Sequence, residues 1–136
     1  MVVLRDELLA LRSVDDIIKA RHLVRDCAVS QGLSLVDQTK LVTAASELAR
    51  NALVHGGGGE MQLQALNDDV RKGIRIVFTD HGPGIADIRK AMKDGFSTSG
   101  GLGLGLGGAR RLVDDFEIRS APGQGTTVTI ARWQQG

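Results

Sequence analysis

Cysteine is scarce in this 136-residue chain: Cys27 is its one cysteine, so an internal disulfide is excluded. A single cysteine is typical of proteins in a reducing compartment, and we expect a cytoplasmic location with Cys27 as a buried structural thiol. Apolar runs long enough to cross a membrane are also missing, and segment 1–16 is too charged for a signal peptide. These absences predict a protein that does not bind membranes.

Aromatic residues are few as well, with three Phe, one Trp and no Tyr. Proteins that bind single-stranded nucleic acid stack its bases on such residues. Charge of either sign is not in excess, because 17 basic and 16 acidic residues nearly cancel. We therefore expect no nucleic-acid partner. The length suits one domain with a sizeable core, and we assign residues 1–136 to a single domain.

Several catalytic motifs are absent from the sequence. It has no Gly-Lys pair, which excludes a P-loop, and no His-Arg-Asp or Asp-Phe-Gly triplet, which excludes the ordinary protein-kinase fold. One Cys and three scattered His argue against a zinc site. A G-x-G-x-x-G match over residues 103–108 does not follow an expected strand, so it does not indicate a dinucleotide-binding fold.

Glycine is the residue in excess, and a glycine- and leucine-rich run spans residues 100–108. Such a run leaves its backbone N–H groups free, and where it leads into a helix these groups suit a phosphate. The leucines can pack the loop over a bound ligand, so we interpret the run as a lid. A flexible surface loop is the alternative, and an isolated run of this kind supports both interpretations equally.

Hydrophobic periodicity and turn residues predict both helices and strands. The expected helices span residues 14–31, 34–55, 85–93 and 106–114. The expected strands span residues 60–66, 73–80, 116–120 and 126–133, the last two as a hairpin. Residues 6–12 fit a strand or a short helix. This order predicts an α/β fold, a two-layer sandwich whose mixed, mostly antiparallel sheet is covered by helices on one face.

The helix expected over residues 34–55 carries a polar stripe of Thr43, Glu47, Asn51 and His55. Residues four apart share a helix face. An Asn oxygen is a hard ligand suited to Mg²⁺, and a carboxylate beside it can accept a proton as a general base. A solvated helix face is the alternative, and for the pair Glu47 and Asn51 alone it is the favoured one. For His55 we prefer an interaction with the helix C-terminus.

The strand that ends at Asp80 places this residue on the same face as Ile76 and Phe78, because side chains alternate along a strand. A carboxylate at the end of a core face needs a hydrogen-bond donor, and an adenine amine is one, with room for the ring beside the glycines of the next turn. An Asp that caps its own turn is an equally supported alternative. Thr126, on one face with Val128, can line the same pocket, although threonine is common in strands.

Four motifs occur together in one order: Ser-Glu-Leu-Ala-Arg-Asn over 46–51, Asp80-x-Gly82-x-Gly84, the glycine run, and Gly-x-Gly-Thr ending at Thr126. This is the order of the N, G1, G2 and G3 boxes of the GHKL (Bergerat-fold) ATP-binding superfamily, which the chain resembles over residues 14–133. Segment 94–103 and the first motif resemble the RsbT-type serine/threonine kinases specifically. The anti-sigma kinases of the RsbW and SpoIIAB type resemble both stretches less.

The resemblance implies roles for individual residues. Glu47 would be the general base toward the acceptor hydroxyl, and Asn51 would bind the Mg²⁺ that bridges the phosphates of ATP. Asp80 would bind the adenine amino group, and Thr126 would support the adenine through water. The glycines implied in nucleotide binding are Gly82 and Gly84 beside the adenine and Gly101, Gly103 and Gly105 in the phosphate lid.

The lid has no lysine, which leaves the charge of the transferred phosphoryl group to Mg²⁺, backbone N–H groups and an arginine. Arg50, Arg110 and Arg111 are the candidates, and for each we favour a solvated or partner-facing role.

The function implied by the resemblance is that of an ATP- and Mg²⁺-dependent protein serine/threonine kinase. Its substrate would be a STAS-domain antagonist protein in a bacterial partner-switching pathway that controls a sigma factor or stress signalling. The resemblance also implies that the chain docks on and activates a PP2C-type phosphatase. The alternatives are an anti-sigma factor kinase that binds a sigma factor directly, a mainly non-catalytic binding module, and a bare ATPase.

Overall fold

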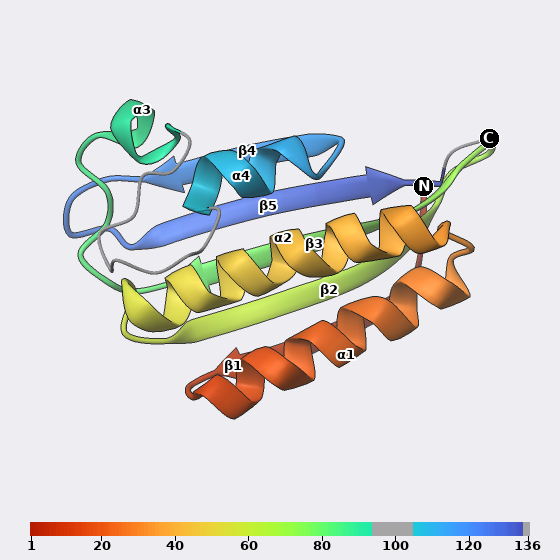
Figure 1. Ribbon diagram of the computed structural model, residues 1–136, viewed down its shortest axis with the longest axis horizontal. Helices are drawn as coiled ribbons and strands as arrows, with labels where there is room; N and C mark the ends of the chain where they lie inside the picture. The colour runs from red at the N-terminus through yellow and green to blue at the C-terminus, as the bar shows by residue number, and fades with distance from the viewer. Residues whose placement is uncertain (94–104, 135–136) are drawn as a thin grey trace.

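The computed structural model describes residues 1–93 and 105–134, which form two layers, a sheet and a set of helices (Figure 1). The strands are β1 (Val2–Leu11), β2 (Gly59–Asn67), β3 (Lys72–Asp80), β4 (Asp115–Ser120) and β5 (Thr126–Trp133). The helices are α1 (Val14–Ser30), α2 (Leu35–Val54), α3 (Ile88–Ala91) and α4 (Gly105–Arg111). The predicted α/β sandwich is confirmed.

The sheet has the strand order β1-β2-β3-β5-β4, and every neighbouring pair in it is antiparallel. We expected a mixed sheet with some parallel pairing. Strands β3 and β4 do run in the same direction, but β5 lies between them, so they do not pair. The sheet that the described residues form is therefore antiparallel throughout.

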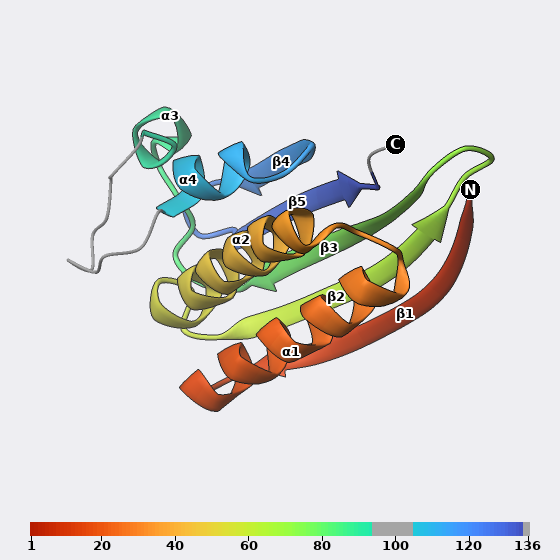
Figure 2. The same cartoon turned by 45° about the vertical axis from the view of Figure 1, so that its right-hand side comes forward.

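Helices cover one face of this sheet. Helices α1 and α2 lie side by side across it, and α4 continues the layer next to α2 (Figures 1 and 2). Leu41, Ala45, Leu48 and Ala52, the predicted apolar stripe of α2, are all buried. They share one core with residues of the central strands such as Leu63, Ile76 and Ile130. Burial of these two apolar faces against each other explains why helices and sheet form one packed unit.

The structure settles one open assignment and shortens two of the expected helices. Residues 6–12 lie mostly in β1, which pairs with β2. The helix expected over 85–93 is reduced to α3, because the side chain of Asp87 accepts a hydrogen bond from Lys90 N (3.0 Å) and caps the helix there. Helix α4 ends before residue 114, because Asp114 N donates to Ala131 O (2.9 Å) and so joins the chain to β5.

A buried ion pair joins the start of α2 to the end of β5. Arg132 Nη2 donates to Asp37 Oδ1 (2.5 Å), and both side chains are 10% exposed. Arg132 Nη1 also donates to Leu112 O (3.0 Å), just after α4. The hydrogen bond from Arg132 holds the pKa of Asp37 below its usual value. This contact therefore fixes both helices to the same end of the sheet.

Candidate functional site

The candidate site lies where β3 ends and β5 begins. In the sheet register Asp80 is directly opposite Thr126, and Thr126 is directly opposite Ser120 at the end of β4. Directly opposed residues of antiparallel strands project to the same face. The three side chains thus form a row on the helix-covered face, which we call the Asp80 row. The end of the sheet that carries it is the Asp80 end.

Asp80 is half-buried, and Ile76 and Phe78 on the same face of β3 are buried, as the alternation predicted. Its Oδ1 accepts a hydrogen bond from Gly82 N (2.9 Å), so Asp80 caps its own turn. No described residue donates to its second oxygen, Oδ2. The two interpretations of Asp80 are therefore compatible, because the turn uses one oxygen and the other remains able to accept from a ligand.

The end of α2 packs directly against the turn that follows Asp80. A Cβ atom on Gly56 would overlap the carboxyl group of Asp80, and a Cβ on Gly82 would overlap the backbone of Gly56. Only glycine lets these two segments approach so closely. The packing brings α2, with its polar stripe, and the Asp80 row to the same end of the molecule.

The loop after Asp80 also packs on the β4–β5 turn. Gly84 has a φ of +77°, and a Cβ there would overlap the carbonyl oxygen of Ala121. Gly123 N donates to Pro83 O (2.8 Å) across the same contact. The sequence motifs Asp80-x-Gly82-x-Gly84 and Gly123-x-Gly125-Thr126, far apart in the chain, are therefore neighbours in space.

The polar stripe of α2 leads toward this site. Thr43, Glu47 and Asn51 are half-buried, and His55, the last of the stripe, is exposed next to Gly56. No described residue forms a hydrogen bond or ion pair with the side chain of Glu47 or Asn51. These two side chains thus keep their oxygens available for a ligand or a metal ion.

Most of the predicted phosphate lid lies outside the residues that the structure describes. Gly101 and Gly103 lie outside the described ranges, and Gly105 is the half-buried first residue of α4. Arg50, Arg110 and Arg111 are exposed. Within residues 1–93 and 105–134, no three His, Cys, Asp or Glu side chains are grouped to hold a metal ion.

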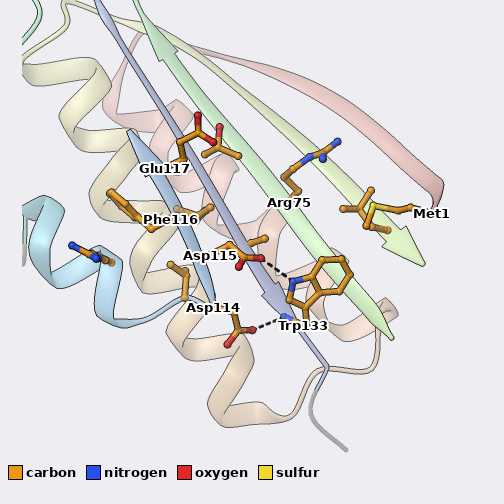
Figure 3. Close-up of a pocket in the computed structure, with 13 residues that line it drawn as sticks. Met1, Arg75, Asp114, Asp115, Phe116, Glu117 and Trp133 are labelled. Atoms are coloured by element: carbon orange, nitrogen blue, oxygen red, sulfur yellow. Dashed lines mark hydrogen bonds between the residues drawn. The ribbon is translucent and has the colours of Figure 1, made fainter. Parts of the chain in front are cut away.

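A cavity of about 510 Å³ lies at the opposite end of the sheet, where Arg110 and Trp133 contribute to its lining (Figure 3). Trp133 Nε1 donates to Asp115 Oδ2 (3.0 Å), and Trp133 N donates to Asp114 Oδ2 (2.8 Å). The guanidinium of Arg71 lies 4.2 Å from the centre of the indole ring. The polar groups of Trp133, Asp114 and Asp115 are already partnered, and no residue that lines this cavity belongs to the four motifs, so the Asp80 end is the better candidate.

Two residues that build the site were missed by the sequence analysis. Gly56 was interpreted only as part of the end of α2, and its contact with Asp80 has no signal in the sequence. Ser120 was interpreted as an ordinary strand residue, although it lies in the row with Thr126. Its place directly before the Gly-x-Gly turn is the one feature that pointed to it.

Comparison with known proteins agrees with this geometry. A family model described as "Histidine kinase-, DNA gyrase B-, and HSP90-like ATPase" matches residues 36–135. The serine/threonine-protein kinase RsbT of Bacillus subtilis (strain 168) is 48% identical over 118 residues, which cover 87% of this chain and 89% of RsbT. An anti-sigma F factor of Thermoanaerobacter sp. (strain X514) is 29% identical, covering 84% of this chain and 82% of its own length.

Solved structures show the same fold. The RsbU and RsbW domains of a Mycobacterium tuberculosis protein match with a TM-score of 0.66 and 21% identity, covering 97% of this chain and 33% of that one. The mycobacterial sensor histidine kinase MprB matches with a TM-score of 0.56 and 17% identity, over 95% of this chain and 97% of MprB. In the described residues, no helix is both long and apolar enough to span a bilayer.

The order of the four motifs in the sequence, the packing of the described ones around the Asp80 row and the match to the family model lead to one assignment. The chain belongs to the histidine kinase-, DNA gyrase B- and HSP90-like ATPases and, within them, to the RsbT-type serine/threonine-protein kinases.

Proposed function

We propose that this RsbT-type kinase binds Mg²⁺-ATP at the Asp80 end and transfers a phosphoryl group to a serine or threonine of a STAS-domain antagonist protein. The observation that supports it most is the Asp80 row, where a carboxylate with an available oxygen lies opposite Thr126. Around the row, Gly56, Gly82 and Gly84 allow close backbone packing that any larger residue would prevent, and this packing positions the carboxylate.

Asp80 and Thr126 fit the adenine of ATP. The exocyclic amine of adenine donates hydrogen bonds, and Asp80 Oδ2 has no donor among the described residues. Gly82 and Gly84 let the turn after Asp80 pack closely on Gly56 and Ala121, which holds the carboxylate at the end of β3 where an adenine amine could reach it. The phosphates would then extend toward α4, whose first residue is Gly105.

Asn51 and Glu47 fit the phosphate end of the nucleotide. Asn51 lies five residues before Gly56, and Glu47 lies one turn further from Asp80 along α2. With about 1.5 Å of rise per residue, Glu47 lies one helical turn beyond Asn51, and in this proposal the triphosphate lies along the stripe. The amide oxygen of Asn51 suits Mg²⁺, which would neutralise phosphate charge when bound. Glu47 would accept the proton of the incoming hydroxyl.

The partner assignment rests on relatives. RsbT of Bacillus subtilis carries the name of a serine/threonine-protein kinase, and the more distant relatives include anti-sigma F factors. The identity of 48% with RsbT against 29% with an anti-sigma F factor favours an antagonist protein over a sigma factor as the main partner. Docking on a PP2C-type phosphatase would be a second, non-catalytic role of the same chain.

Replacement of Glu47 by Gln tests the function directly. Glu47→Gln removes the proton acceptor but keeps the size of the side chain, so phosphoryl transfer should fall by about 10²–10⁴-fold. ATP affinity should stay within about twofold, because Glu47 lies away from the Asp80 row. The assay is mass spectrometry of the STAS partner after incubation with Mg²⁺-ATP, with nucleotide affinity measured by calorimetry.

Three outcomes decide between the alternatives. Full phosphorylation by Glu47→Gln would contradict the assignment of the base. A wild-type chain that binds the STAS partner and ATP but transfers nothing would favour the binding module. Tight binding of a sigma factor by the wild type would favour the anti-sigma kinase. Thr39→Ala, on the exposed start of α2, is the control variant and should leave catalysis unchanged.

A further inference from the structure

Ser120 is the centre of the hydrogen bonds that join the two halves of the site. Its Oγ accepts from Ile85 N (2.8 Å), in the loop that follows Asp80 and Gly84. The same Oγ donates to Gly125 O (2.8 Å) and lies 2.7 Å from Thr126 Oγ1, where either hydroxyl can be the donor. One half-buried hydroxyl therefore holds the loop and the β4–β5 turn together.

The number of protons and lone pairs on the Ser120 hydroxyl decides which residue donates in its hydrogen bond with Thr126. A serine hydroxyl has one proton and two lone pairs. Gly125 O is a carbonyl and only accepts, so the proton of Ser120 is used there. Ile85 N occupies one lone pair, and the second lone pair is left for Thr126. Thr126 must then donate its own proton to Ser120.

This direction fixes how Thr126 faces a ligand. With its proton directed to Ser120, Thr126 Oγ1 presents only lone pairs toward the site. Asp80, directly opposite in the register with Cβ atoms about 4.5–5.5 Å apart, also presents only acceptors. The row thus offers two adjacent acceptors and no donor. A ligand group that carries two N–H bonds, or a water that both groups orient, satisfies it.

We propose that Ser120 is a positioning residue that sets purine specificity: by taking the proton of Thr126 it makes the Asp80 row accept hydrogen bonds only. The inference rests on the proposed binding of ATP at this end. The 6-amino group of adenine donates to such a row, whereas guanine bound in the same ring pose places its 6-oxo acceptor against acceptors. Ser120 would thereby favour ATP over GTP without touching either nucleotide.

The test is the ratio of ADP to GDP affinity, measured by calorimetry on the full chain so that no turnover is needed. In Ser120→Ala, Thr126 is free to turn its proton toward the ligand. ADP affinity should fall by about five- to tenfold, the equivalent of one ordinary hydrogen bond, while GDP affinity holds or rises. Ser120→Thr restores a hydroxyl at the position and should return the ratio toward that of the wild type.

Controls separate specificity from folding. Thr127→Val changes the neighbouring threonine on the other face of β5 and should leave the ratio unchanged. Thr126→Val removes the second acceptor and its bond to Ser120, while Ser120 keeps its bonds to Ile85 N and Gly125 O, and it should also lower the ratio. Thermal unfolding of each variant shows whether it folds. A lower melting temperature of Ser120→Ala with an unchanged ratio means that Ser120 is only structural, and the proposal fails.

The result for the wild type separates this inference from the proposed function. If the wild type binds ADP and Asp80→Asn weakens that binding, the site is correctly placed, and an unchanged ratio in Ser120→Ala overturns the role of Ser120 alone. If the wild type binds neither ADP nor ATP, the proposed function fails and the inference fails with it.

Discussion

The two ends of the sheet differ in how far their polar side chains are hydrogen-bonded within the protein. At the end where β5 finishes, which we call the Trp133 end, Trp133 hydrogen-bonds to Asp114 and Asp115, and Arg132 pairs with Asp37. The buried Gln31 adds bonds to Leu66 O (3.0 Å) and Gly73 O (2.8 Å). At the Asp80 end, Asp80 Oδ2 has no donor among the described residues.

The difference separates stability from function. Trp133, Asp37 and Gln31 at the Trp133 end are hydrogen-bonded within the protein, so these bonds contribute to folding. At the Asp80 end, glycine contacts at Gly56 and Gly84 hold the backbone in place while leaving acceptors for a ligand. Substitutions at the Trp133 end should therefore lower the free energy of unfolding with little effect on nucleotide affinity. Substitutions at the Asp80 end should lower nucleotide affinity with little effect on stability.

The largest effect on stability should come from breaking the ion pair at the Trp133 end. Arg132→Met leaves the buried carboxylate of Asp37 without its partner, and such a loss costs about 3–5 kcal/mol of unfolding free energy. Urea denaturation measures it, and ADP affinity measured below the transition should stay within about twofold of the wild type.

A double variant is the control for Arg132→Met. Asp37→Leu with Arg132→Met removes both charges and should recover most of the lost stability, because no buried charge is left unpaired. The wild-type pair is itself incompletely satisfied, because Arg132 Nε has no hydrogen bond to any described residue. Replacing Arg132 also removes this unsatisfied group, which favours the recovery. A double variant as unstable as Arg132→Met would contradict this account.

A smaller effect, confined to binding, is expected at the Asp80 end. Asp80→Asn keeps an oxygen that can accept from Gly82 N but replaces the second acceptor with a donor. Loss of a charged hydrogen bond costs about 1.5–3 kcal/mol, or roughly ten- to a hundredfold in ATP affinity. Calorimetry measures the affinity, and the urea midpoint should stay close to that of the wild type. An equal loss of stability and affinity would show that the two ends are not separate.

Periodicity in the sequence predicted which side chains share a face within single helices and strands. The alternation in β3 placed Asp80 on the core face, and the spacing in α2 placed Glu47 and Asn51 on one side. Parity within single elements also placed Thr126 correctly on the face of Val128. The four motifs in order then identified the family.

The rest depends on contacts between segments that are distant in the chain. The pairing of Thr126 with Asp80 is a matter of sheet register, and the hydrogen bonds of Ser120 require β4, β5 and the loop after Asp80 to be in place. The ion pair of Asp37 with Arg132 joins residues 95 positions apart. No local pattern encodes such contacts, so propensity and periodicity did not predict them.

The smallest effect is on the pH dependence of folding, and it too should follow the Trp133 end. The pKa of Asp37 is lowered from its usual 3.8 because Arg132 donates a hydrogen bond to its ionised form. In the unfolded chain Asp37 takes up a proton near pH 3.8, whereas in the folded chain it does so only at lower pH. The pair therefore contributes its full stability above that value and loses it as the pH falls through the folded pKa. Urea midpoints measured from pH 6 downward should fall more steeply for the wild type than for Asp37→Leu with Arg132→Met. Other carboxylates with lowered pKa values, Asp6, Asp16 and Asp68, are present in both proteins and cancel in the difference. Parallel acid profiles of the two proteins would show that the pair contributes nothing to acid stability, and the Trp133 end would then owe its stability to packing and neutral hydrogen bonds alone.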